Sequence, residues 1–378
     1  MARILIAPDS FKGSLTASQF CQISEHVIQQ IMPDAEVIQL PLSDGGEGFV
    51  DAFVSAGLAT QESLWVSGPL GKKVKAAFAW QESSKTAMIE MAQASGLPKV
   101  RPDEGNPMQT HTYGTGQVIQ AALDKGAQKV VLGLGGSATN DGGIGALQAL
   151  GVEILDAKGI SVGLGGQALK TIAKIGEIPQ ILTQVEWVLA CDVTNPLLGE
   201  EGATAIFGPQ KGLQEHQFDF LENGLDNWAQ VMQDKLGKDV RGIPGAGAAG
   251  GMAAGFIGVL NAHIEPGFEV LREQLEIDAA MEPKDGKPLD LVITGEGRID
   301  QQTAFGKLPV RIAELAKEHR VPCIGICGSL GATLDELPAF TALFSIVNTP
   351  MDEMDAMNNA PPLLASCLQN ILALRGLK

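Results

Sequence analysis

Basic residues are scarce in this sequence. Its 378 residues include 27 Lys and Arg against 44 Asp and Glu, a formal net charge of −17. Nucleic acids and anionic membranes bind basic surfaces, so this charge argues against both as partners. The apolar run before Asp9 is too short for a signal peptide, whose core spans roughly 7–15 residues. The uncharged stretch 242–262 is mostly Gly and Ala, which indicates a loop and a buried helix rather than a membrane span.

Metal-binding and redox motifs are also missing. The five cysteines and five histidines form no CxxC, HExxH or paired His–Cys pattern, so we expect neither a zinc site nor a disulfide framework. An odd number of cysteines without a secretory signal indicates reduced thiols and a cytoplasmic protein. Cys323 and Cys327 lie in the apolar run VPCIGICGS and are expected to pack in a core. The Walker A sequence and the protein-kinase signatures are absent, which excludes those two classes of phosphotransferase.

Glycine is plentiful, and the chain is long. The 46 glycines among 378 residues are about 12%, against a usual value of ~7%. The length exceeds what one core usually serves, so we expect two domains. Apolar strands alternate with helices at both chain ends, which predicts an α/β fold with an open parallel sheet of about six strands. We predict one domain from residues 1–68 and 286–378 together, and a second α/β domain, 69–285, inserted into it. The strand expected at SLWVSG (63–68) is counted in the first sheet.

Charged residues follow three of the strands predicted for the first domain. Open parallel sheets bind ligands at the carboxyl ends of their strands. Four of the acids there, Asp9, Asp44, Glu296 and Asp300, need cations or a divalent metal beside them if they converge. A single acid in a turn is more often a cap, but the whole set favours a site. The residues at these strand ends are Asp9, Ser10 and Lys12; Ser43, Asp44 and Glu47; and Glu296, Arg298 and Asp300.

The inserted domain carries glycine-rich loops. GLGGSA (133–138) follows the apolar KVVL and fits the G-x-G-x-x-A dinucleotide fingerprint, with Glu153 or Asp156 near the distance of a ribose-binding acid. The next residues, TNDGG, suit a loop whose N–H groups hold phosphate; the alternative is a tight turn that caps a helix. A second match, Gly245–Gly250, follows no apolar strand. Close helix packing explains that match as well as phosphate contact does.

Two further polar positions stand out in the inserted domain. Asp192 comes directly after the apolar strand EWVLAC, where a carboxylate can bind metal or accept a hydroxyl proton. Lys211 lies in the turn FGPQKG, although most lysines are simply solvated.

Seven motifs in this order resemble those of the type I bacterial glycerate kinases. They are PDSFKGSLTA, LSDGGEG, GLGGSATNDGG, CDVTNP, FGPQKG, PGAGAAGG and TGEGRIDQQTAFGK. The resemblance implies ATP-dependent phosphorylation of glycerate with Mg²⁺ in the cytoplasm, D-glycerate giving 2-phosphoglycerate. It also implies one Rossmann-like domain, a second α/β domain and an active site in the cleft between them.

Roles for individual residues are hypotheses built on that resemblance. Phosphoryl transfer needs cations around the phosphates and a group at the attacking hydroxyl. We assign catalysis to Asp192, Lys12 and Arg298. Glycerate binding is assigned to Asp9, Ser10, Phe11, Asp44 and Asn195. Nucleotide binding, or a cradle for the substrate, is assigned to Gly135, Gly136, Ser137, Asn140, Asp141, Lys211 and Gly247. The candidate magnesium ligands are Glu296, Asp300 and Asp44.

Two other functions fit part of the pattern. The loop after KVVL allows a nicotinamide-dependent oxidoreductase of small hydroxy acids, although the many acidic residues suit metal and phosphate better. A two-domain protein that binds a sugar acid without turnover is the third alternative. In each case the expected partners are small molecules, and a homodimer is compatible with the sequence.

Overall fold

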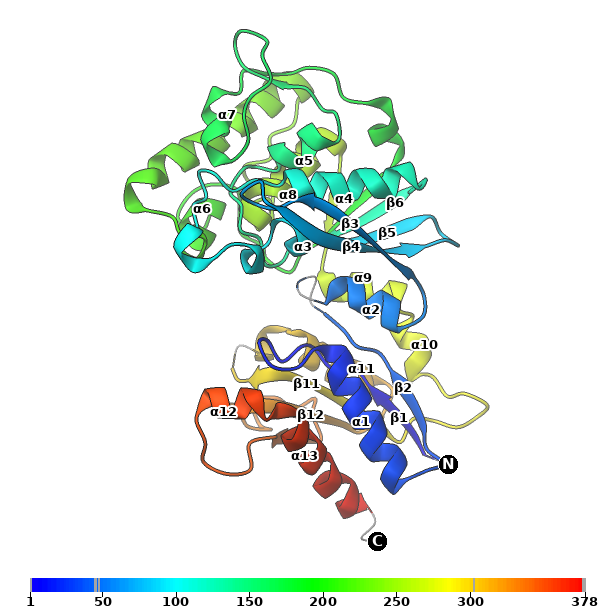
Figure 1. Ribbon diagram of the computed structural model, residues 1–378. Helices are drawn as coiled ribbons and strands as arrows, with labels where there is room; N and C mark the ends of the chain where they lie inside the picture. The colour runs from blue at the N-terminus through cyan, green and yellow to red at the C-terminus, as the bar shows by residue number, and fades with distance from the viewer. Residues whose placement is uncertain (1, 44–45, 47, 302, 376–378) are drawn as a thin grey trace. The chain divides into compact units, whose positions relative to one another are not determined.

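The computed structural model describes residues 2–43, 46, 48–301 and 303–375, and its chain divides into two compact units (Figure 1). Unit 1 comprises Met1–Asp44, Asp51–Leu58 and Phe268–Lys378, and unit 2 comprises Gly45–Val50 and Ala59–Gly267. The main boundaries between the two units fall after residues 58 and 267. The sequence predicted these boundaries after residues 68 and 285. Each unit has its own sheet and its own buried core.

The sheet of unit 1 is entirely parallel, in the order β13-β12-β11-β1-β2. Numbered along the chain within this unit, the strands run 2-1-3-4-5, a doubly wound order whose topological switch point lies between β1 and β11. Ile4 aligns with Leu291 on one side of β1, and Arg3 aligns with Glu36 on the other. The strands are β1 (Arg3–Ile6), β2 (Glu36–Gln39), β11 (Leu291–Ile299), β12 (Cys323–Leu330) and β13 (Ala342–Ser345).

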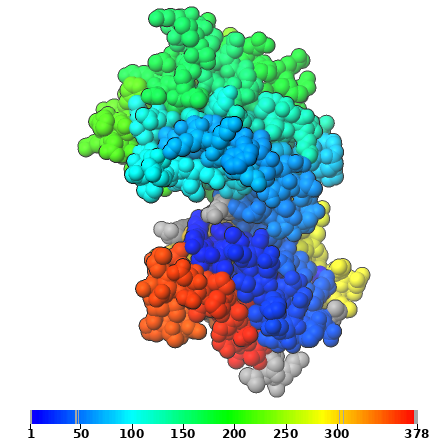
Figure 2. All heavy atoms as spheres, in the orientation of Figure 1, coloured from blue at the N-terminus to red at the C-terminus, as the bar shows by residue number. Residues whose placement is uncertain are grey.

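Helices cover both faces of this sheet. The helices α1 (Ala17–Ile31) and α13 (Ala360–Arg375) pack on each other and on the face that carries Ile4 and Ile6. Side chains alternate along a strand, so Leu5 points to the opposite face, where α11 (Leu308–Glu318) packs on β11 and β12. Figure 2 shows the two ends of the chain beside each other on the surface of unit 1. The shorter helices are α2 (Phe49–Ser55), α9 (Gly267–Gln274), α10 (Ile277–Met281) and α12 (Glu353–Asn358).

Unit 2 has a mixed sheet in the order β10-β9-β6-β5-β4-β3. The strands β3, β4 and β5 are antiparallel, and β5, β6, β9 and β10 are parallel. The predicted strand SLWVSG falls in β3, which pairs with β4, so its assignment to the first sheet is wrong. A short turn suffices for an antiparallel pair, whereas a parallel pair needs a long crossover. The strands are β3 (Thr60–Ser67), β4 (Lys73–Gln81), β5 (Thr86–Glu90), β6 (Lys129–Gly133), β9 (Glu186–Ala190) and β10 (His263–Glu265).

Six helices and a short ribbon complete unit 2. The uncharged stretch 242–262 contains α8, in which every residue except Ile257 is buried. Within the described part of the chain, no helix combines the length and apolar character that a membrane span requires. The helices are α3 (Ala92–Ser95), α4 (Tyr113–Asp124), α5 (Ile144–Ala149), α6 (Ala203–Phe207), α7 (Phe218–Leu236) and α8 (Ala248–Leu260); the ribbon is β7 (Ile154–Leu155) with β8 (Lys174–Ile175).

Close backbone packing explains the glycines at the start of α8. Ala249, Gly250 and Gly251 are left-handed, with φ of 53°, 67° and 81°. The Gly142 N–H donates to the Gly250 carbonyl at 3.0 Å. A Cβ on Gly250 would lie 2.0 Å from the Thr139 carbonyl oxygen. The packing alternative for the motif Gly245–Gly250 therefore describes its structural role.

Replacing Gly250 by alanine tests this packing. We expect Gly250→Ala to lower the free energy of unfolding of unit 2 by about 3 kcal/mol or more, because the clash is with backbone. The matched control is Gly237→Ala, where φ is 70°, close to the 67° of Gly250, but no atom lies within 4 Å of the new Cβ. This substitution should cost only about 1 kcal/mol. Urea denaturation followed by tryptophan fluorescence measures both, since all four tryptophans, 65, 80, 187 and 228, lie in unit 2. Equal losses would contradict the packing argument.

Candidate functional site

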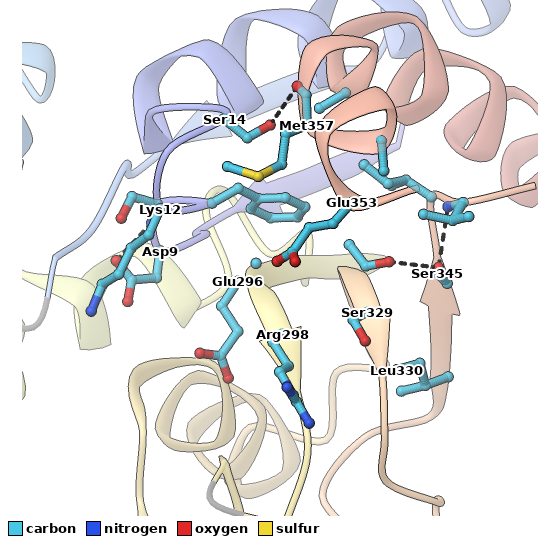
Figure 3. Close-up of a pocket in the computed structure, with 18 of the residues that line it drawn as sticks. Asp9, Lys12, Ser14, Glu296, Arg298, Ser329, Leu330, Ser345, Glu353 and Met357 are labelled. Atoms are coloured by element: carbon cyan, nitrogen blue, oxygen red, sulfur yellow. Dashed lines mark hydrogen bonds between the residues drawn. The ribbon is translucent and has the colours of Figure 1, made fainter. Parts of the chain in front are cut away.

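A pocket of about 770 Å³ opens in unit 1 beyond the carboxyl ends of β1, β11, β12 and β13 (Figure 3). It adjoins the switch point, where the loop after β1 and the end of β11 diverge. Six of the residues predicted for the site line this pocket: Asp9, Ser10, Phe11, Lys12, Glu296 and Arg298. Asp44 and Glu47 lie outside the described residues.

The loop after β1 forms one wall. Asp9 is buried; its N–H donates to the Gly295 carbonyl at 2.8 Å, and its Oδ1 accepts the Ser10 N–H at 2.6 Å. Lys12 is exposed and makes no ion pair with any residue that the structure describes. Phe11 is 3% exposed and packs on Phe20 with ring centroids 5.5 Å apart, so its side chain belongs largely to the core.

Glu296, at the end of β11, is held by two donors. Its Oε1 accepts from Thr303 Oγ1 at 2.8 Å, and its Oε2 pairs with Lys307 Nζ at 3.3 Å. Burial raises the pKa of Glu296, while Thr303 and Lys307 act in the opposite direction. Lys307 was not singled out from the sequence, although it is the last residue of the motif TGEGRIDQQTAFGK. Its place in that motif was the available signal.

The carboxylates predicted as magnesium ligands already bind cations. Asp300 Oδ2 lies 2.9 Å from Arg298 Nε, and Glu296 pairs with Lys307. No group of three or more His, Cys, Asp or Glu able to hold a metal ion occurs among the residues described. Magnesium in phosphotransferases is commonly held by one or two carboxylates, several waters and the substrate phosphates. These carboxylates therefore fit an ion that arrives with a nucleotide better than a resident one.

The glycine-rich motifs of unit 2 form an interior polar network instead of an open loop. Asp141 is fully buried and accepts from Thr112 N, Thr112 Oγ1, Gly143 N and Gly145 N, at 2.8, 2.9, 3.1 and 3.4 Å. Asn140 Nδ2 donates to Thr204 Oγ1 at 3.2 Å. Lys211, only 2% exposed, donates to the Thr139 carbonyl at 2.7 Å.

Burial controls the electrostatics of this network. It lowers the pKa of Lys211 to about 7, an effect that Asp141 opposes. It raises the pKa of Asp141, which the donors at Thr112 and the nearby His111 counteract. It also lowers the pKa of His111. His111 was missed, because a single histidine outside any motif gives no signal in the sequence.

Asp192 and Asn195 follow β9, outside this network. Asp192 is exposed, and its Oδ1 accepts the Gly267 N–H at 2.9 Å. Asn195 is half-buried; its Nδ2 donates to the Glu201 carbonyl at 2.8 Å, and its carbonyl accepts the Gly247 N–H at 3.0 Å.

The loop of Gly135, Gly136 and Ser137 lies nearer the surface than the polar network. Gly136 is exposed, Gly135 is half-buried and Ser137 is buried. The Gly136 carbonyl accepts the Leu97 N–H at 2.9 Å. Part of this loop is therefore fixed by backbone pairing with the segment after α3.

The structure overturns the dinucleotide-fingerprint alternative. In that fingerprint the glycines open a helix, whereas α5 begins only at Ile144. Glu153 Oε2 accepts the Glu177 N–H at 3.1 Å, and Asp156 Oδ1 accepts the Lys158 N–H at 2.8 Å. Glu153 thus holds the backbone that follows β8, Asp156 fixes its own turn, and the oxidoreductase alternative has no support.

Comparison with known proteins agrees with the motifs. The family model described as the glycerate kinase family matches residues 4–375. The chain is 44% identical over 375 residues to the glycerate kinase of Halalkalibacterium halodurans, covering 98% of this chain and 97% of that protein. It is 42% identical over 376 residues to the glycerate 2-kinase of Escherichia coli K12, with the same two coverages of 98% and 97%.

A solved structure gives the same result for the fold. The crystal structure of a protein provisionally assigned as glycerate kinase 2 from Salmonella typhimurium LT2 matches with a TM-score of 0.87 and 41% identity, covering 100% of this chain and 98% of that one. The fold, the motifs and the near-complete coverage lead to one conclusion: this chain belongs to the glycerate kinase family.

Proposed function

We propose that this chain phosphorylates glycerate with ATP, converting D-glycerate to 2-phosphoglycerate. Relatives that share 42–44% of its residues over nearly their whole length are named glycerate kinases, and one is named a glycerate 2-kinase. The observation that carries the proposal is the pocket at the switch point. It gathers Lys12, Arg298 and Lys307 with Asp9 and Glu296, the mixture of charges that a phosphoryl-transfer site requires.

In this reaction a hydroxyl oxygen of glycerate attacks the γ-phosphorus of ATP. The bond from that phosphorus to the β–γ bridging oxygen breaks, ADP leaves, and the hydroxyl proton passes to a base. The three cations offset the negative charge on the transferring group. The exposed carboxylate of Asp192 is the group that we expect to accept this proton. The nearby loop that carries Asn195 is the one that we expect to contact glycerate.

Magnesium would neutralise phosphate charge when bound with the nucleotide. Of the carboxylates predicted as ligands, the described ones are Glu296 and Asp300, and each already pairs with a cation. We therefore expect these two to contact the ion through water.

The setting of the enzyme is a further part of the proposal. All five cysteines are free thiols, which supports a reducing compartment such as the cytoplasm. Assembly of this chain into a homodimer, with which the sequence is compatible, remains a prediction.

Coupled release of ADP tests the reaction. With ATP and magnesium we expect turnover with D-glycerate but not with L-glycerate, tartrate, lactate or glycerol. Phosphorus NMR of the product should identify 2-phosphoglycerate. Turnover with none of these acceptors would refute the proposed function, and 3-phosphoglycerate would refute the proposed position of transfer.

The role of Asp192 is tested by Asp192→Asn, which keeps the shape of the side chain and removes its basicity. We expect kcat to fall by about 10²-fold or more, the scale of general base catalysis, with a smaller change in KM. The control is Glu200→Gln in the same loop, where the side chain is also exposed and which should leave kcat unchanged. Near-native turnover by Asp192→Asn would show that another group accepts the proton.

A further inference from the structure

We propose that the pocket of unit 1 is the nucleotide site, with the base between α12 and the residues after β13 and the phosphates over the ends of β1 and β11. This inference rests on the proposed function, because it takes ATP as the phosphoryl donor. It assigns the nucleotide to unit 1. Asp9, Ser10 and Phe11, which the sequence predicted to bind glycerate, are accordingly reassigned to nucleotide binding.

The size of the pocket favours a nucleotide over glycerate. Its volume of about 770 Å³ falls within the range of roughly 300–1,000 Å³ typical of sites for cofactors and drug-sized ligands. A three-carbon acid would fill only a small part of it and leave most of the lining without contacts. An adenosine triphosphate reaches from one end of such a space to the other.

The two ends of the pocket differ in chemistry, as the two ends of a nucleotide do. On the side of α12 most lining residues are apolar, although Asp352 and Glu353 at the start of that helix also line the pocket. Figure 3 shows Met357 on this side, away from Glu296 and Arg298 at the strand ends. Methionine is flexible, and its sulfur makes favourable contacts with aromatic rings, which suits a planar base. The apolar lining residues on this side are Ile346, Val347, Met351, Ala356, Met357 and Ala360.

The opposite end suits phosphates that carry a metal. Lys12, Arg298 and Lys307 line it, but the pocket as a whole also holds four carboxylates, Asp9, Glu296, Asp352 and Glu353. Carboxylates thus outnumber cations by one, which disfavours a bare polyanion. The magnesium complex of a nucleotide carries less negative charge and is the form we expect to bind.

Hydrogen bonds hold the walls in place before any ligand binds. Ser14 Oγ donates to the Met357 carbonyl at 3.0 Å and so ties the loop after β1 to α12. Ser345 Oγ donates to the Gly328 carbonyl at 2.9 Å and ties β13 to β12. A pre-formed site with few mobile walls is typical of nucleotide and cofactor pockets.

The glycine-rich motifs of unit 2 are the competing nucleotide site, and their packing argues against them. Asn140, Asp141 and Lys211 are buried and bonded to protein groups. A Cβ on Gly247 would lie 2.3 Å from the Pro196 carbonyl oxygen. Gly247 therefore lies against backbone, which leaves little room for a triphosphate beside it.

Two tryptophan substitutions on α12 test the assignment. Ala356 lines the pocket and is half-buried, so Ala356→Trp should fill the place of the base without disturbing the core. Met354, on the same helix, is 65% exposed and does not line the pocket, so Met354→Trp is the matched control. Titration calorimetry with magnesium and ADP, or a non-hydrolysable ATP analogue, measures binding, and circular dichroism verifies that both variants fold.

We expect Ala356→Trp to weaken nucleotide binding by about 30-fold or more and Met354→Trp to leave it unchanged. KM for glycerate in each variant should stay within about twofold of the parent, because glycerate binds elsewhere. Equal nucleotide affinity in Ala356→Trp and the parent would overturn the inference while turnover of glycerate still supported the proposed function. If the parent protein binds nucleotide but turns over no glycerate, and Ala356→Trp abolishes that binding, the proposed function is refuted and the nucleotide site is supported. A parent protein that binds no nucleotide would overturn both.

Discussion

Parallel pairing of β1 with β11 is the constraint on which unit 1 depends. Ile4 and Leu291, which face each other in this pairing, are separated by most of the chain. Because β2 lies on the other side of β1, the strand order reverses there, and the loops that follow β1 and β11 turn to opposite faces of the sheet. The pocket opens at that divergence. Neither Asp9 nor Glu296 would belong to a site without this pairing, since each comes from a different end of the sequence.

The two units use polar residues in different ways. In unit 1, charged side chains at the strand ends line a pocket, and Lys12 and Arg298 remain exposed. In unit 2, the polar residues of the glycine-rich motifs are turned inward and bonded to one another. Burying Asp141 and Lys211 is costly, and the donors around Asp141 and the carbonyl at Lys211 offset that cost. Such a network fixes the position of the loops that contribute to it.

We assign one substrate of the proposed reaction to each unit. Unit 1 supplies a large pocket with an apolar end and a cationic end, which suits the donor. In unit 2, the loop that carries Asp192 and Asn195 is the one to which we assign the acceptor. The ion pairs Glu296–Lys307 and Asp300–Arg298 offset the charges of these acids and cations. This suits a nucleotide that binds together with its metal ion.

The sequence by itself determined the α/β class, the strand–loop–helix alternation and the family, because apolar periodicity and long motifs are local. It also predicted that Asp9, Lys12, Glu296 and Arg298 lie at the carboxyl ends of strands, from which their meeting at one sheet edge could be predicted. Tertiary structure decided the rest. Whether β3 joined the first or the second sheet depended on its pairing with β4. Whether Asn140 and Asp141 faced solvent or the interior depended on how α8 packed against their loop. Lys211 is buried and bonded to the Thr139 carbonyl in the same network. The part played by Lys307 depended on its distance from Glu296. Burial and partner choice are properties of the packed chain, so no local pattern contains them.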